Sequence, residues 1–139
     1  MSDRQNLEVF SRWIAAHRAH DIDQMLTMVS ESITIQSAAG AAMPPAKGKE
    51  EARKHWQTIF TTFPDMRMEE LDTVSDATTI FAEISHGGTM LGSMGPHDPT
   101  GKEYRTNGAF RIDFVDGQID SILSYWDTAA MLRQLALTS

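Results

Sequence analysis

His86 is a side chain of this sequence that is well suited to acid–base chemistry. It alternates with Ile80, Ala82 and Ile84, so it should lie on the inward face of a strand predicted over about residues 78–90. A neutral imidazole can act as a base, an acid or a hydrogen-bond donor near pH 7. The alternative is a structural histidine whose ring nitrogens are satisfied inside the core.

A carboxylate and a second histidine are further candidates. Asp127 could act as an acid, but it directly precedes a helix predicted to begin at Thr128, and it is therefore also suited to cap that helix. His17 follows Trp13 by one turn on the apolar side of the first predicted helix, so it faces either a cavity or the helix end. No His-x-His or histidine–carboxylate grouping indicates a metal site.

Large aromatic residues recur at positions that could surround a small apolar molecule. Because aromatic residues at helical spacing are more often core, we expect this set to divide between the core and the wall of a cavity. With His17, the predicted ligand-binding residues are Trp13, Trp56, Phe60, Phe110 and Trp126.

The elements that position these residues follow an order typical of an α+β fold. The apolar periodicities predict helix, helix, strand and helix, followed by four consecutive strands and a short terminal helix. We expect one domain over residues 1–139. The segregation of helices from meandering strands predicts that a curved, mostly antiparallel sheet wraps around the N-terminal helices in this domain. The predicted ranges are 2–20, 21–29, 33–35, 49–63, 66–74, 78–90, 104–115 and the hairpin and helix within 110–135.

The hairpin around Asp116-Gly117 has two possible registers. A plain two-residue loop would place Asp127 on the face of Phe110, whereas a bulge at Gly117 would place Ser124 and Trp126 there. Both faces of the second arm carry apolar residues. One face should cover the interior, and the other should meet a second subunit in a homodimer.

Composition excludes several classes of protein. The net charge of -7 argues against nucleic acid as a partner, and the absence of cysteine excludes disulfides and thiolate metal sites. No apolar run has the length of a membrane span, and the polar N-terminus does not resemble a signal peptide, so cytoplasmic residence is expected. The loop over residues 37–47 is a candidate lid, although the sequence does not decide whether it closes.

Several short segments, taken together, resemble one family. In chain order they are Trp56-x-x-x-Phe60-x-x-Phe63-Pro64-Asp65, His86-x-Gly88, Pro99-Thr100-Gly101-Lys102, Phe114-Val115-Asp116-Gly117-Gln118-Ile119, Trp126-Asp127 and Leu132-Arg133-Gln134-Leu135. Their order and spacing over about residues 5–137 resemble the SnoaL-like polyketide cyclases. These belong to the cone-shaped α+β superfamily of nuclear transport factor two-like proteins.

The resemblance implies a pocket for an apolar, often polycyclic or ketonic, small molecule, and dimerisation through the outer face of the sheet. It also implies an intramolecular aldol closure that uses no metal or organic cofactor. The family's acid/base Asp falls on Ser124 here, its second Asp on Asp127, and its strand His on Phe110. This placement favours the bulged register and makes His86 the leading functional polar residue.

Three functions follow from these residues. The first is a cofactor-independent cyclase, isomerase or hydratase that uses His86 as its acid or base. The second is a binding or carrier protein that retains the pocket without the acid, as Ser124 favours. The third is a hydrolase or hydroxylase-type protein in which Ser124, Asp127 and His86 position water.

Overall fold

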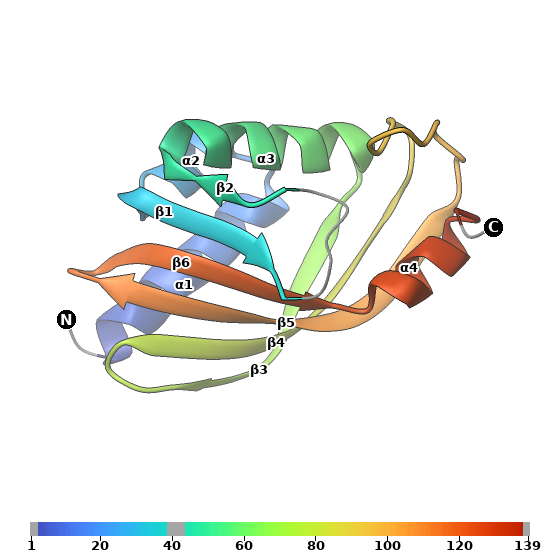
Figure 1. The fold of residues 1–139 in the computed structure, drawn as a ribbon. Helices are drawn as coiled ribbons and strands as arrows, with labels where there is room; N and C mark the ends of the chain where they lie inside the picture. Colours follow the sequence, from blue (N-terminus) through green and yellow to red (C-terminus); the bar gives the residue numbers. More distant parts are fainter. Residues whose placement is uncertain (1–2, 39–43, 138–139) are drawn as a thin grey trace.

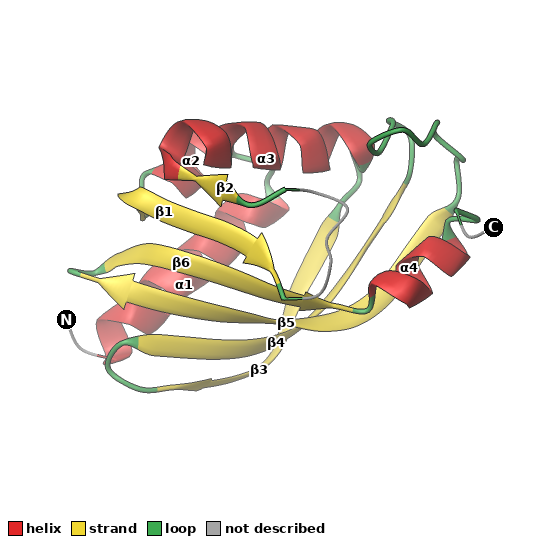
Figure 2. Cartoon of the chain, in the orientation of Figure 1, coloured by secondary structure: helices red, strands yellow, loops and turns green. Residues whose placement is uncertain are grey.

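The computed structural model describes residues 3–38 and 44–137, which form helices packed on one curved sheet (Figures 1 and 2). The elements are α1 (Asp3–Arg18), α2 (Ile22–Leu26), β1 (Val29–Ser37), β2 (Ala46–Lys47), α3 (Gly48–Thr62), β3 (Arg67–Ser75), β4 (Thr79–Thr89), β5 (Glu103–Val115), β6 (Gln118–Trp126) and α4 (Thr128–Gln134). Within this part of the chain, the predicted α+β class is confirmed, and every predicted helix and strand is present.

The sheet has the strand order β2-β1-β6-β5-β4-β3. All neighbouring strands are antiparallel except β1 and β6, which run parallel. In Figure 1, α1 crosses behind the sheet, and α3 lies at the top of the view, beside β1 and β2. Helix α4 lies at the end of β6. The inner face of β4, β5 and β6 is therefore covered by α1 and α3, and the core lies between them.

The helices form where apolar residues recur every three or four positions. In α1 the buried stripe includes Phe10, Trp13, Ile14 and His17, each no more than 3% exposed. The short helix α2 begins as predicted, because the carboxylate of Asp21 accepts a hydrogen bond from the backbone N–H three residues later. Helix α3 ends directly before Phe63 and Pro64, where a proline cannot continue the hydrogen-bond ladder.

Strand β1 differs most from its prediction. It begins at Val29, which the sequence assigned to the second helix, and it is longer than the predicted strand over 33–35. Val29 is fully buried and pairs with Ile119 of β6, so packing against a strand distant in sequence overrides the local helical pattern. Residues 39–43 of the candidate lid lie outside the described residues, as does Ser2, where the first helix was predicted to begin.

The hairpin between β5 and β6 combines a tight turn with a bulge. Asp116 and Gly117 form a two-residue loop in which both φ angles are positive, as a type I′ turn requires. The bulge predicted at Gly117 lies instead at Asp120, whose carboxylate accepts hydrogen bonds from Ser30 at 2.6 Å and Ser32 at 2.9 Å. These serines belong to β1, so strand β1 holds the bulge in place.

The bulge decides which side chains of β6 face inward. After it, Ser124 pairs with Phe110, and Trp126 pairs with Gly108. The predicted face was therefore correct, although the predicted position of the bulge was wrong. Among the described residues, the helices lack the combination of length and apolar character that crossing a membrane requires.

Candidate functional site

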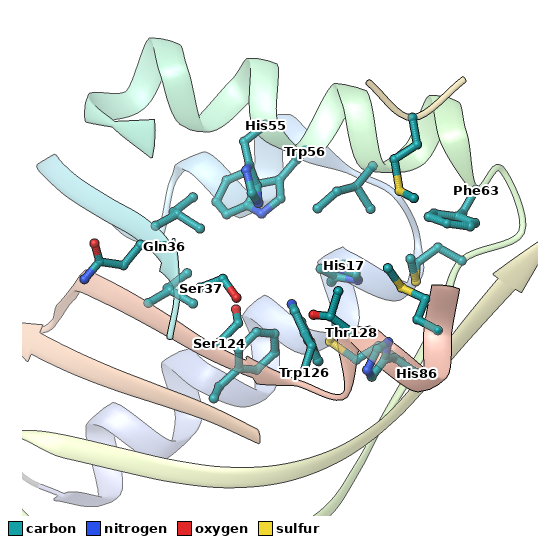
Figure 3. A pocket seen from close by; sticks show the side chains of 18 of the residues that line it. His17, Gln36, Ser37, His55, Trp56, Phe63, His86, Ser124, Trp126 and Thr128 are labelled. Carbon is teal, nitrogen blue, oxygen red and sulfur yellow. The ribbon is translucent and has the colours of Figure 1, made fainter. Parts of the chain in front are cut away.

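An apolar cavity of about 140 Å³ lies between α1, α3 and the inner face of the sheet (Figure 3). In Figure 3, His55 and Trp56 project into it from α3, opposite Ser124 and Trp126 of β6. The described residues that line it are Trp13, His17, Ile35, Gln36, Ser37, Pro44, His55, Trp56, Ile59, Phe63, Met66, Met68, His86, Met94, Tyr104, Phe110, Ile122, Ser124, Trp126, Thr128 and Met131. None of these is Asp, Glu, Lys or Arg.

Aromatic rings that contact one another form much of the cavity wall. Trp13 meets Phe110 edge-on at a centroid distance of 5.6 Å, and Phe110 meets Trp126 edge-on at 5.2 Å. Trp13 also contacts Trp56 at 6.1 Å. Trp13, Phe110 and Trp126 therefore form one aromatic wall of the cavity, and Trp56 lines it from α3, opposite Trp126. Such edge-on pairs add stability beyond the area they bury, so the wall is well ordered.

Trp126 can lie flat against the sheet because residue 108 is glycine. A Cβ atom at Gly108 would come within 2.5 Å of the Trp126 ring and 2.7 Å of the Tyr125 carbonyl oxygen. Contacts this short do not occur between real side chains, so a larger residue at this position would displace the indole. Gly108 thus allows the indole of Trp126 to form part of the cavity wall.

His86 lies on the inward face, as its alternation predicted, and is 4% exposed. Its Nδ1 is 2.9 Å from the Tyr104 hydroxyl, and its Nε2 is 3.1 Å from the Thr106 hydroxyl. Its ring also packs on Trp126 at 4.0 Å. Burial lowers the pKa of His86 to about 4, so the ring is neutral at neutral pH. Both nitrogens have partners, and the imidazole can exchange a proton only through those hydroxyls.

His17 and His55 differ from His86 because each has a buried ring nitrogen without a partner. Nδ1 of each is unpaired among the described residues, as is the indole N–H of Trp13. Burial lowers the pKa of His17 to about 3, helped by the nearby His20, His86 and His55. Burial also lowers the pKa of His55 to about 4. These rings are neutral and can offer hydrogen bonds to a ligand or a water molecule.

Ser124 is 7% exposed and sits at the cavity surface. It pairs with Ser37 of β1, and Figure 3 shows the two hydroxyls pointing toward one another. Neither hydroxyl forms a hydrogen bond with a described residue. The pair therefore presents two hydrogen-bond donors at one end of an otherwise apolar space.

Two predicted site residues do not line the cavity. Asp127 is exposed, and its carboxylate accepts a hydrogen bond from the Ala130 backbone N–H at 3.0 Å, which makes it the N-cap of α4. The structure thus places it in the capping role, not beside Ser124. Phe60 is partly buried and turns toward the end of α1, where it stacks on His20 at 4.1 Å and contacts His17.

Tyr104 and Ser37 belong to the site but were not among the predicted residues. Tyr104 alternates with Thr106, Gly108 and Phe110 along β5, so the period-two argument used for His86 could have found it. Burial raises the pKa of the Tyr104 hydroxyl, which therefore stays protonated. For Ser37 the sequence carries no comparable signal, because its position depends on the parallel pairing of β1 with β6.

The arrangement suits an uncharged ligand. Its polar groups are neutral imidazoles, hydroxyls and an indole N–H, and no charged side chain lines the described cavity. Burying an unpaired ion there would be costly. Among the described residues, no cluster of three or more histidine or carboxylate side chains is arranged to hold a metal ion.

One sequence comparison identifies a family, and the structure comparisons show the fold. The family model of the SnoaL-like polyketide cyclases matches residues 8–135. A search of curated proteins returned no match. Solved structures described as NTF2-like, cystatin-fold and ketosteroid isomerase-like also match, which is consistent with the cone-shaped α+β architecture.

Three solved structures illustrate the likeness. A candidate SnoaL-like polyketide cyclase from Jannaschia sp. CCS1 has a TM-score of 0.87 at 15% identity, covering 99% of this chain and 95% of its own. AclR, a candidate hydroxylase from Streptomyces galilaeus, has a TM-score of 0.82 at 17% identity, covering 99% and 89%. TerC, co-crystallized with polyporic acid, has a TM-score of 0.81 at 15% identity, covering 95% and 98%. At these identities the likeness shows the fold.

Proposed function

Because the chain belongs to the SnoaL-like polyketide cyclase family, we propose that it binds a small, uncharged, largely apolar ketone in the cavity between α3 and the sheet. The observation that carries this proposal is the lining itself, which combines aromatic and methionine side chains with a few neutral hydrogen-bond donors. Concave sites of this composition are typical of small-molecule binding. The structural neighbour TerC was co-crystallized with polyporic acid, which is also a small organic molecule, although an acidic one.

A ketone suits these donors better than a charged ligand does. The hydroxyls of Ser37 and Ser124 can each donate to a carbonyl oxygen, and neither requires a counter-charge. An anion would find no Lys or Arg in the described lining. No step of this binding calls for a metal or an organic cofactor.

The binding proposal predicts that filling the cavity blocks the ligand. All three tryptophans of the chain line the cavity, so their indole N–H signals in nitrogen-edited NMR spectra report on it. Titration with acetophenone should shift these signals saturably. The substitution Ile122→Phe puts extra volume into the lining and should weaken binding by at least about tenfold, which corresponds to about 1.4 kcal/mol.

The matched control is Leu123→Phe, which makes the same kind of change one residue later on the outer face of the same strand. It should bind acetophenone as the wild type does. Equal affinity in the two variants, or no saturable shift with any ring ketone, would contradict the proposal.

A second candidate function is cofactor-independent acid–base catalysis of the cyclase or isomerase type. The observation that favours it is the chain of hydrogen bonds from Tyr104 through His86 to Thr106, beside the cavity. Such a chain can take a proton from the α-carbon of a bound ketone and return a proton to the enolate that results. Because the pKa of His86 is low, we expect this activity to be slow in the wild-type protein.

We also propose that the protein is a homodimer joined through the outer face of the sheet. Val74, Phe81 and Tyr125 are 67%, 41% and 43% exposed, and the last two rings contact each other at 5.7 Å. Clustered exposed apolar residues often mark an interface. Cytoplasmic residence of this dimer remains our expectation from the sequence.

The dimer predicts a mass of twice 15.5 kDa in light scattering at micromolar concentration. Phe81→Asp should shift the protein to the monomer mass while leaving acetophenone binding intact, because the substitution lies on the opposite face from the cavity. Leu91→Asp, which changes an even more exposed apolar residue in the loop after β4, is the control and should remain dimeric. A wild-type monomer would refute the interface.

A further inference from the structure

The size of the cavity limits the ligands that can enter it. Its volume is about 140 Å³. An engineered apolar cavity of about 150 Å³ in another protein takes up benzene. Pockets for drug-sized ligands hold about 300–1,000 Å³. The space in this protein thus matches one six-membered ring with a short substituent.

The aromatic wall cannot retreat to admit a larger ring system. Trp13 and Phe110 are 1% and 4% exposed and are held between other rings. Behind Trp126 lies the backbone of Gly108, so close that not even a Cβ atom would fit between them. Backbone moves far less readily than a flexible side chain. Enlarging the space on this side would therefore require a shift of β5 itself.

The two ends of the cavity differ in chemistry. At one end, the hydroxyls of Ser37 and Ser124 point toward one another without a partner among the described residues. Figure 3 shows Phe63 on the opposite side of the space, and Met66 and Met94 pack with Phe63 in one cluster that reaches the lining. Methionine side chains adapt to irregular apolar groups. One end thus suits an oxygen atom, and the other suits a short alkyl group.

From these observations we infer that the ligand is a single-ring aryl ketone. Its ring lies against the aromatic wall, and its carbonyl oxygen lies at the Ser37 and Ser124 hydroxyls. This inference rests on the proposed function and narrows it. The ligand class it names is smaller than the polycyclic compounds that the family resemblance implies.

A series of ketones that differ only in ring number tests the size limit. Acetophenone, acetonaphthone and acetylanthracene carry the same acetyl group on one, two and three fused rings. Their affinities for the wild-type protein, measured by the indole N–H shifts, should fall along this series. We expect the loss from one to three rings to be at least about a hundredfold, because the larger rings require the wall to move.

The position of the carbonyl oxygen is tested by removing one hydroxyl. Ser124→Ala should weaken acetophenone binding by about two- to tenfold, the effect of one hydrogen bond. It should leave the binding of ethylbenzene, which has no oxygen, unchanged. Ser121→Ala, on the outer face of the same strand, is the matched control and should affect neither ligand.

The outcomes separate this inference from the proposal beneath it. If none of the three ketones binds, the proposed function fails and the inference fails with it. If acetylanthracene binds as tightly as acetophenone or more tightly, binding stands but the single-ring limit is overturned. If Ser124→Ala weakens both acetophenone and ethylbenzene, or neither, the placement of the oxygen is wrong.

Discussion

Acidification from about pH 7 to pH 4 is expected to destabilise this protein strongly, and the cause lies in its buried histidines. Burial lowers the pKa of His17 from 6.5 to about 3 and that of His86 from 6.5 to about 4. The unfolded chain therefore binds protons at these positions that the folded chain does not bind. The free energy of unfolding falls as the pH drops below 6.5 and continues to fall until the folded pKa is reached.

The expected size of this effect is large for a domain of ordinary stability. Each unit of pKa difference corresponds to about 1.4 kcal/mol, so each of these two histidines costs on the order of 2 kcal/mol by pH 5. Such domains are stable by about 5–15 kcal/mol in all. Hydrogen bonds from Thr89 lower the pKa of Asp65 below 3.8, so this carboxylate affects the stability only at more acidic pH. The window from pH 6.5 to 4 thus reports on histidines.

Urea unfolding, followed by tryptophan fluorescence across this pH window, measures the slope. His17→Phe should flatten it, because the substitution removes one titrating group and keeps an aromatic ring between Trp13 and Phe60. It should also cost little stability at neutral pH, since it removes a buried nitrogen that has no partner. His97→Phe, in an exposed loop, is the control for the loss of one histidine. An unchanged slope in His17→Phe would contradict this explanation.

Ser124→Asp is expected to turn a binding cavity into a site for enolisation. The new carboxylate would be buried opposite Phe110, with no cationic side chain in the described lining. Burial without a charge partner raises the pKa of a carboxyl group toward the range useful for a general base. A positioned base contributes about 10²–10⁴-fold to proton transfer. We therefore expect deuterium exchange beside the carbonyl of acetophenone to be at least about a hundredfold faster than in the wild type.

The same substitution should lower the free energy of unfolding by about 1–3 kcal/mol, the cost of an imperfectly paired buried polar group. Ser121→Asp makes the same change on the outer face of β6 and should affect neither exchange nor stability by a comparable amount. If the wild type already exchanges as fast as Ser124→Asp, the carboxylate is not the missing base. The chain through His86 would then have to supply it.

Much of the fold could be predicted because its signals are local. The alternation that includes Ile80 and His86 marked an inward face, and both residues are buried. The start of β1 was missed because its pairing with β6 is not visible in the local pattern. The bulge was expected at Gly117, the residue most tolerant of positive φ, but it formed at Asp120 because serines of β1 hydrogen-bond to that carboxylate.

The site was predicted less completely, because a cavity depends on residues that meet only in three dimensions. Trp13, Trp56 and Trp126 were expected at its wall and line it. The partners of His86 were not predicted, since they require the register of β4 against β5, which places His86 opposite Thr106. Phe60 lies one helical turn after Trp56 on α3, so the spacing predicted both for the cavity. The ring of Phe60 instead stacks on His20 and does not line the cavity.

The parallel pairing of β1 with β6 has a consequence for how the chain folds. Ser30 and Asp120, which hydrogen-bond across that pair, are 90 positions apart in the sequence. Non-local pairings of this kind slow folding, because a long loop must close before the contact forms. During synthesis, β1 must wait for nearly the whole chain before it gains its neighbour in the middle of the sheet. Until then its edge toward β6 is unpaired, and unpaired strand edges make a nascent chain prone to aggregation.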